Sequence, residues 1–358
     1  MGGALGDRAP DGHLLARVLR VPDSVRGFDA AAWTALLAIA RAEQMIGTLA
    51  WRLGGVAVPA GVARILADAC ASAEQGRIAA LWEAEAARRA LAPLGERLVL
   101  LKGTAFVAAG LRAGEGRSIG DLDILVPQSA LDGVETALLG AGWEWVKPDP
   151  YDDDYYREWM HELPPLIHRD RDRMIDVHHT ILPLTARVTP DAAALLADAV
   201  EVAPGLWTLS PEDMIVHAAA HLFADGDLAG GMRNLWDIDQ LCREFAAQQS
   251  DFYLCVYERA AHHGLSDAVE RALRLCHRLY DTPAVGYTVP ITVDLNPRRS
   301  DALYLRRITA RDGWGRATRP VARMAFYIRS HWLRMPPAML ARHLWTKWRK
   351  GGAGPASG

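Results

Sequence analysis

Two aspartates, Asp121 and Asp123, stand at the start of the short apolar segment DLDILV. Side chains of a β-strand alternate between its two faces, so these carboxylates would point the same way. Two neighbouring carboxylates repel each other unless a cation or a basic group lies between them. A solvated strand end would also fit the pattern taken alone. The spacing nevertheless points to a strand that holds a divalent metal ion on one face.

A third carboxylate, Asp176, lies inside another apolar segment, MIDVHHTI. Alternation places Asp176 and His178 on the same face of that strand. Three aspartates on adjacent strands can supply the bridging and flanking ligands of two metal ions about 3.5 to 4 Å apart. His178 then either contacts the acceptor substrate or forms a hydrogen bond inside the fold. On this reading Asp123→Asn should weaken metal binding and leave the fold intact or stabilised, because it relieves repulsion between carboxylates.

Basic and small residues surround these acids. Lys102, Gly103 and Thr104 follow the apolar run RLVLL, at a point where a strand is expected to turn into a helix. Free N–H groups at a helix start, with a glycine that allows close approach, form a phosphate cradle. Arg117 and Ser118, just before the DLDILV segment, are further candidate nucleotide contacts. For Lys102 and Arg117 the alternative is a salt bridge to the aspartates without substrate.

Two other pairs have a pattern that could bind metal. His217 and His221 are four residues apart on a predicted helix, but Ala218 stands where a zinc-binding H-E-x-x-H motif has glutamate. We therefore expect packing or hydrogen bonding there and no zinc. Asp237 and Asp239 also lie in a helical context, where residues two apart diverge around the axis. They are expected to cap or form salt bridges.

The rest of the sequence predicts the helices and strands that position these residues. Helical periodicity covers residues 29–53, 59–91, 104–111 and 129–142, and it returns from 211 to about 282. Short apolar or alternating runs predict strands in the segments RLVLLKG, DLDILV, WEWV, PPLIHR and RMIDVHHTIL. The expected fold is α+β, with a small mixed sheet at 96–206, helical regions at 1–95 and 207–290, and a basic segment at 291–358.

The segments LLKGTA, RSIGDLDILV, MIDVHHTI and LSPEDMIVHAAAH, in this order, resemble the nucleotidyltransferase superfamily that includes DNA polymerase beta. More narrowly, residues 30–285 resemble the bacterial group of uncharacterised nucleotidyltransferases. The resemblance implies that Gly103 and Thr104 meet a triphosphate. It also implies that Asp121 and Asp123 bind Mg²⁺ or Mn²⁺, and that Asp176 completes the site and helps to deprotonate the acceptor.

The chain departs from the superfamily in two places. Thr104 replaces the usual serine, although it keeps the hydroxyl, and the 18 positions from Gly103 to Asp121 exceed the usual gap. The function that follows is metal-dependent transfer of a nucleotidyl group from a nucleoside triphosphate to a hydroxyl of a peptide, sugar or other small molecule in bacterial biosynthesis. A nucleotide-sugar donor at the same metal site, and a non-catalytic protein that binds a nucleotide or polyanion, are the alternatives.

Composition sets the class of protein and its expected surroundings. Of 358 residues, 50% are hydrophobic and 23% charged, which is typical of a globular protein. No apolar run reaches membrane-spanning length, no secretory signal is apparent, and the four cysteines are scattered, so a cytoplasmic location is expected. Residues 297–350 carry 14 Arg and Lys against two acids. This basic segment faces either the acidic body of the protein or an anionic partner, which includes a peripheral membrane contact. Nucleic acid is not an expected partner.

Overall fold

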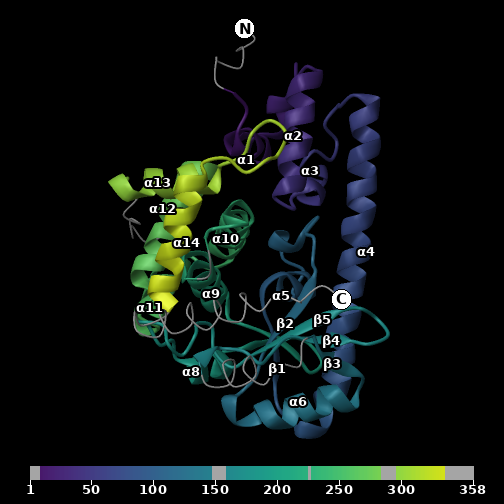
Figure 1. The fold of residues 1–358 in the computed structure, drawn as a ribbon, viewed down its shortest axis with the longest axis vertical. Coiled ribbons are helices and arrows are strands. Elements are labelled where there is room, and N and C mark those ends of the chain that lie inside the picture. The colour runs from purple at the N-terminus through teal and green to yellow at the C-terminus, as the bar shows by residue number, and fades with distance from the viewer. Residues whose placement is uncertain (1–8, 147–158, 225–226, 284–295, 335–358) are drawn as a thin grey trace, which may run out of the picture.

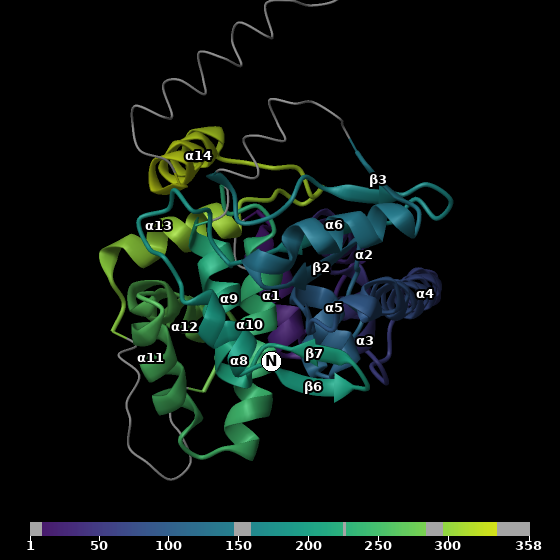
Figure 2. The same ribbon diagram turned by 90° about the horizontal axis from the view of Figure 1, so that it is seen from below.

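The structure, a computed structural model, describes residues 9–146, 159–224, 227–283 and 296–334. Its centre is one seven-stranded mixed sheet, with helices on both flanks. The long helix α4 runs along one side of the sheet, and α9 to α14 lie on the opposite side, as both views show (Figure 1, Figure 2). This is the α+β arrangement with helical flanks that the sequence predicted.

The seven strands follow the spatial order β3-β4-β5-β2-β1-β7-β6. The central pair, β2 and β5, is parallel and sets Asp123 directly opposite Asp176. The pairing of β1 with β7 is also parallel, whereas the other neighbours are antiparallel. The strands are β1 (Leu98–Leu100), β2 (Asp121–Leu125), β3 (Trp143–Trp145), β4 (Leu166–His168), β5 (Met174–His178), β6 (Val200–Ala203) and β7 (Leu206–Thr208).

Among the described residues, four helices precede the sheet, and two of them lie where the sequence predicted one. The segment 29–53 forms two helices instead of one, because Gln44 between them adopts a φ of +55°. Its carbonyl accepts a hydrogen bond from Nη2 of Arg233 at 2.7 Å. A contact to a distant helix thus ends the first of the two. These four helices are α1 (Gly12–Arg20), α2 (Ala30–Ala42), α3 (Ile46–Arg52) and α4 (Ala60–Leu91).

The later helices complete the layers around the sheet. Short α5 follows β1 directly, and α6 covers the lower face of the sheet in Figure 1. Ser210 caps the start of α9, since its hydroxyl accepts from the Asp213 N–H at 3.2 Å. Their bounds are α5 (Lys102–Ala108), α6 (Leu131–Gly140), α8 (Ala192–Ala197), α9 (Pro211–Ala224), α10 (Gly231–Gln248), α11 (Phe252–His262), α12 (Ser266–Tyr280), α13 (Arg299–Ile308) and α14 (Pro320–Arg334).

A close backbone crossing joins α3 to the loop before β2. An added Cβ on Gly47 would lie 2.5 Å from the carbonyl oxygen of Gly116, and one on Gly116 would lie 2.3 Å from that of Gly47. Buried Thr48 lies at the same crossing and accepts a hydrogen bond from Nη1 of Arg233 at 2.8 Å. The N-terminal helices, the loop and α10 therefore meet at one buried point, which we call the glycine junction (Gly47, Thr48, Gly116 and Arg233).

The described part of the basic segment packs on the acidic body of the protein. Four of its arginines form ion pairs with carboxylates outside it, at 2.6 to 3.9 Å. The pairs are Arg298–Glu270, Arg307–Asp227, Arg311–Glu43 and Arg319–Asp11. The charge asymmetry is thus partly neutralised inside the molecule. None of the described helices combines the length and the apolar character that crossing a lipid bilayer requires.

Candidate active site

The three aspartates converge at the centre of the sheet. One carboxylate oxygen from each of Asp121, Asp123 and Asp176 lies within 4.8 Å of the others. Parallel pairing of β2 and β5 produces this convergence, because it brings the same faces of both strands together. Asp121 is exposed, Asp176 is partly buried and Asp123 is buried. We call these residues the aspartate cluster.

Two cationic or hydrogen-bonding partners hold Asp123. Its Oδ1 accepts from Nζ of Lys102 at 2.7 Å and lies 3.0 Å from Nε2 of His178. Burial alone would raise the pKa of Asp123, but Lys102 and His178 outweigh it and hold that pKa well below its usual range. Burial likewise opposes the charge of Lys102, yet Asp123 raises the pKa of the amine to about 12. Asp123 is therefore ionised and Lys102 charged at neutral pH.

The surroundings of Asp176 raise its pKa, whereas those of Asp123 lower the pKa of that residue. Burial raises the pKa of Asp176, and the charges of Asp123 and Glu162 add to that effect, so the pKa reaches about 7. The repulsion between the two carboxylates is mutual, but Lys102 and His178 offset it at Asp123, whereas at Asp176 it adds to the effect of burial. The effect of Asp123→Asn on the fold stays a prediction: the change relieves repulsion with Asp176 but also removes the partner of charged Lys102.

A strained turn places Lys102 beside the aspartates. Lys102 connects β1 to α5 with a φ of +49°, a left-handed conformation that costs a non-glycine residue about 1 to 2 kcal/mol. The next residue, Gly103, is in close contact with Arg117, since an added Cβ would lie 2.5 Å from Nε of that arginine. The glycine here makes room for a protein side chain.

Arg117 is fixed by α10 and not by the aspartate cluster. Its Nη1 donates a short hydrogen bond to Oδ2 of Asp237, and the guanidinium lies 5.5 Å from the ring centre of Phe106. Asp237 is only 3% exposed. Lys102 thus forms the predicted alternative salt bridge to an aspartate, whereas Arg117 pairs with an acid 120 residues away. Asp239 also forms an ion pair, with Arg243 at 2.9 Å.

Gly103→Ala is expected to destabilise the protein by about 1 to 3 kcal/mol, because the new methyl group must displace Arg117 from between Gly103 and Asp237. Gly76→Ala is the matched control. Gly76 lies inside α4 with open space around its Cα, so alanine there should stabilise by roughly 0.5 to 1 kcal/mol. Urea unfolding of both variants measures the difference, and equal effects at the two positions would contradict the close packing of Arg117.

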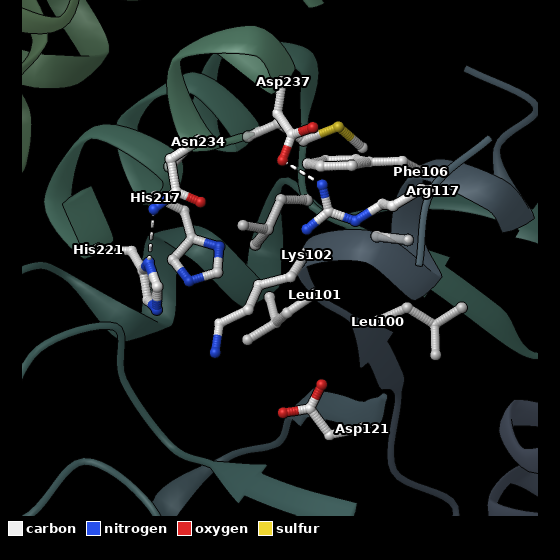
Figure 3. Close-up of a pocket in the computed structure, with 14 residues that line it drawn as sticks. Leu100, Leu101, Lys102, Phe106, Arg117, Asp121, His217, His221, Asn234 and Asp237 are labelled. Carbon is white, nitrogen blue, oxygen red and sulfur yellow. Dashed lines mark hydrogen bonds and ion pairs between the residues drawn. The ribbon is translucent and has the colours of Figure 1, made fainter. Parts of the chain in front are cut away.

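A cavity of about 220 Å³ opens between the sheet and the helices α9 and α10. Figure 3 shows the Lys102 side chain extending into it, with Asp121 on one side and His217 on the other. Burial and the nearby charge of Lys102 hold the pKa of His217 well below its usual range, so this ring is neutral. The lining residues are Leu100, Leu101, Lys102, Ala105, Phe106, Arg117, Asp121, Leu209, Met214, His217, Ala218, His221, Asn234 and Asp237.

The other sequence-predicted site residues lie nearby in different settings. Thr104 is 1% exposed, and its hydroxyl has no hydrogen-bond partner among the described residues. Ser118 is exposed and is not one of the residues lining the cavity. His221 lies 3.4 Å from the Asn234 amide, and no third potential ligand joins His217 and His221 within the described parts of the chain. The sequence DPYDDDYYREWM at 149–160 is dense in acidic and aromatic residues and is expected to form a solvated loop, and most of it lies outside the described residues.

Sequence reasoning missed two residues beside the aspartate cluster, His161 and Glu162. Glu162 Oε2 lies 3.3 Å from Nδ1 of His178. The segment HELPPL that contains them has no alternating pattern, so only the tertiary structure reveals their position against β5.

Comparison with known proteins agrees with this geometry. A protein-family model described as uncharacterised nucleotidyltransferase matches residues 29–281. The matched range contains the whole sheet, the aspartate cluster and the helices that line the cavity. No curated protein matches the chain.

Proposed function

The chain belongs to the uncharacterised nucleotidyltransferase family and is a transferase enzyme; from this we propose that it moves a nucleotidyl group from a nucleoside triphosphate to an acceptor hydroxyl. The observation that carries the proposal is the convergence of three aspartates beside a partly buried lysine, at the mouth of a cavity lined by polar and apolar groups. Phosphoryl chemistry depends mainly on positioning and on neutralising charge, and this arrangement supplies both.

The donor set of the cluster fits a hard divalent cation. It offers only carboxylate oxygens, which Mg²⁺ and Mn²⁺ prefer, and Asp121, Asp123 and Asp176 would hold the ion. When bound, such an ion neutralises charge on the phosphates of the donor and on the leaving group. The mutual repulsion around Asp176 would be relieved by the same ion.

The side chains around the cluster have separable roles. We assign phosphate contacts to Lys102 and to Arg117, whose guanidinium is oriented by Asp237 and Phe106. Gly103, Thr104 and Ser118 stay predicted nucleotide contacts, and His178 a predicted acceptor contact that also positions Asp123. We assign to Asp176 the uptake of the acceptor's proton. The acceptor oxygen forms a bond to the α-phosphorus, the bond to the β-phosphate oxygen breaks, and pyrophosphate leaves.

A thermal-shift screen tests the proposal first. Each of the four nucleoside triphosphates and a set of nucleotide sugars are added to the full chain, with Mg²⁺ and with EDTA. We expect at least one triphosphate to raise the melting temperature only when Mg²⁺ is present, because bound ligands stabilise the native state by mass action. A shift with nucleotide sugars alone would identify the alternative donor, and an EDTA-insensitive shift would contradict a metal-dependent donor site.

The other substrates and surroundings remain predictions. The acceptor is proposed to be a hydroxyl of a peptide, a sugar or another small molecule, in bacterial biosynthesis, and the enzyme is proposed to work in the cytoplasm. Product analysis by mass spectrometry, with the donor that the screen identifies, would show whether a candidate acceptor gains a nucleotidyl group.

A further inference from the structure

A second group of potential metal ligands adjoins the aspartate cluster. His161, Glu162 and His178 each bring a nitrogen or oxygen ligand atom to within 4.8 Å of the others. Unlike the aspartates, this group offers two imidazoles and one carboxylate. Imidazole suits zinc and other transition metals, whereas Mg²⁺ prefers oxygen alone. The two groups therefore differ in the kind of ion that they can select.

Backbone pairing with β5 fixes this geometry. Glu162 forms an antiparallel bridge with His178, and the flanking hydrogen bonds run from Leu163 N to Val177 O at 2.8 Å and from His179 N to His161 O at 2.9 Å. In such a pair the two opposite residues exchange no hydrogen bonds themselves, and their side chains come closest together. His161 lies at a bend just before the bridge, with its ring centre 5.2 Å from that of His178.

The orientation of His178 leaves one of its nitrogens facing an acceptor. Its Nε2 lies 3.0 Å from Oδ1 of Asp123, and a ring that donates to that oxygen carries its hydrogen on Nε2. Its Nδ1 lies 3.3 Å from Oε2 of Glu162. A metal ion in this space would contact both the Nδ1 lone pair and the carboxylate oxygen. A histidine that donates one N–H to a carboxylate while its other nitrogen binds metal is the usual arrangement in metal sites.

We propose that His161, Glu162 and His178 bind one divalent transition-metal ion, of which Zn²⁺ is the representative. Zinc bonds of about 2.0 to 2.1 Å in tetrahedral geometry put neighbouring ligand atoms roughly 3.3 Å apart. Glu162 and His178 already have that separation, and His161 Nε2 lies 3.9 Å from Glu162 Oε2. Three protein ligands leave a fourth position for water. The His161 and Glu162 side chains are 14% and 20% exposed, which gives the ion a path from solvent.

The bound ion would be connected to the aspartate cluster through the His178 ring, whose Nε2 lies 3.0 Å from Asp123. With its Nδ1 on the metal, His178 is held as a neutral donor to Asp123 and can no longer take up a proton there. The proposal concerns metal binding alone, so it stands or falls independently of the transfer reaction.

The test uses the full chain, stripped with EDTA and titrated with Zn²⁺ and with Co²⁺ as a visible-absorbing substitute. Asp121→Asn disables the aspartate cluster and serves as the background in which the second site is measured alone. We expect one tightly bound equivalent in the wild type and in Asp121→Asn, with the visible bands of nitrogen-ligated Co²⁺. His161→Ala and Glu162→Gln should each raise the dissociation constant at least about 100-fold, because even an outer-shell partner is worth 10- to 100-fold.

His262→Ala is the matched control, since its ring is 49% exposed and paired with Asp191. It should bind Zn²⁺ as the wild type does. Metal affinity that is unchanged in His161→Ala, or that disappears in Asp121→Asn, would place the ion at the aspartates and overturn the proposal. So would a wild-type protein that takes up neither Zn²⁺ nor Co²⁺.

Discussion

Asp121→Asn is expected to slow nucleotidyl transfer by about a thousandfold or more while leaving the fold intact. Asp121 is the exposed member of the aspartate cluster, so its replacement disturbs no buried ion pair. The substitution keeps the shape of the side chain and removes one charge from the proposed metal site. A thousandfold loss corresponds to about 4 kcal/mol of transition-state stabilisation, which is the scale expected of metal assistance in phosphoryl transfer.

Pyrophosphate release with the donor identified by thermal shift measures this effect, together with the Mg²⁺ dependence of the melting temperature. Asp68→Asn is the control, because Asp68 is an exposed aspartate on α4 outside the cluster. The control should keep the wild-type rate and the Mg²⁺-dependent shift, and Asp121→Asn should lose both. Wild-type turnover in Asp121→Asn would show that the cluster is not the metal site.

Asp176→Asn is expected to stabilise the metal-free protein above pH 7 by on the order of 3 kcal/mol. The native pKa of Asp176 is about 7, against an ordinary value of 3.8. Well below pH 3.8 the carboxyl group is protonated in both the folded and the unfolded chain, and it contributes no charge. As the pH rises to 7 the unfolded chain releases this proton first, so the wild type loses stability over that interval. Asparagine has no charge to bury, so the free energy of unfolding of the variant should not fall over this pH interval.

Urea unfolding in EDTA at pH 5, 6, 7 and 8 measures the difference between the two proteins. The advantage of Asp176→Asn should grow with pH and level off above about pH 7. Added Mg²⁺ should stabilise the wild type more strongly at pH 8 than at pH 6, because the ion competes with the proton of Asp176. A constant difference across this range would show that Asp176 keeps an ordinary pKa in the folded chain.

Local sequence pattern was sufficient to predict much of the sheet. Continuous or alternating apolar runs identified β1, β2, β4 and β5, because these strands bury their side chains in the core. The hairpin of β6 and β7 was missed, although Pro204 and Gly205 form a turn signal between two short alternating runs. The break at Gln44 could not be predicted, since it depends on a hydrogen bond from Arg233.

In the candidate site, too, some features were predictable from the sequence and others were not. Strand alternation predicted that the three aspartates would share one region, and the parallel register of β2 and β5 brings them together. The partner of Arg117 lies on α10, and no spacing rule connects residues 117 and 237. The position of Glu162 depends on a single bridge to β5. The convergence of the aspartates was therefore predictable from strand alternation, whereas the partner of Arg117 and the position of Glu162 were not.

The glycine junction limits how far this enzyme can be treated as a set of interchangeable modules. A fragment that starts at β1 would keep the aspartates but would lose Gly47 and Thr48, against which the loop ahead of β2 is packed. That loop carries Arg117 into the cavity. Transplanting the sheet alone into another scaffold would therefore transfer the aspartates but would lose the position that Arg117 has in the cavity. The smallest portable unit must begin ahead of α3 and extend through α10.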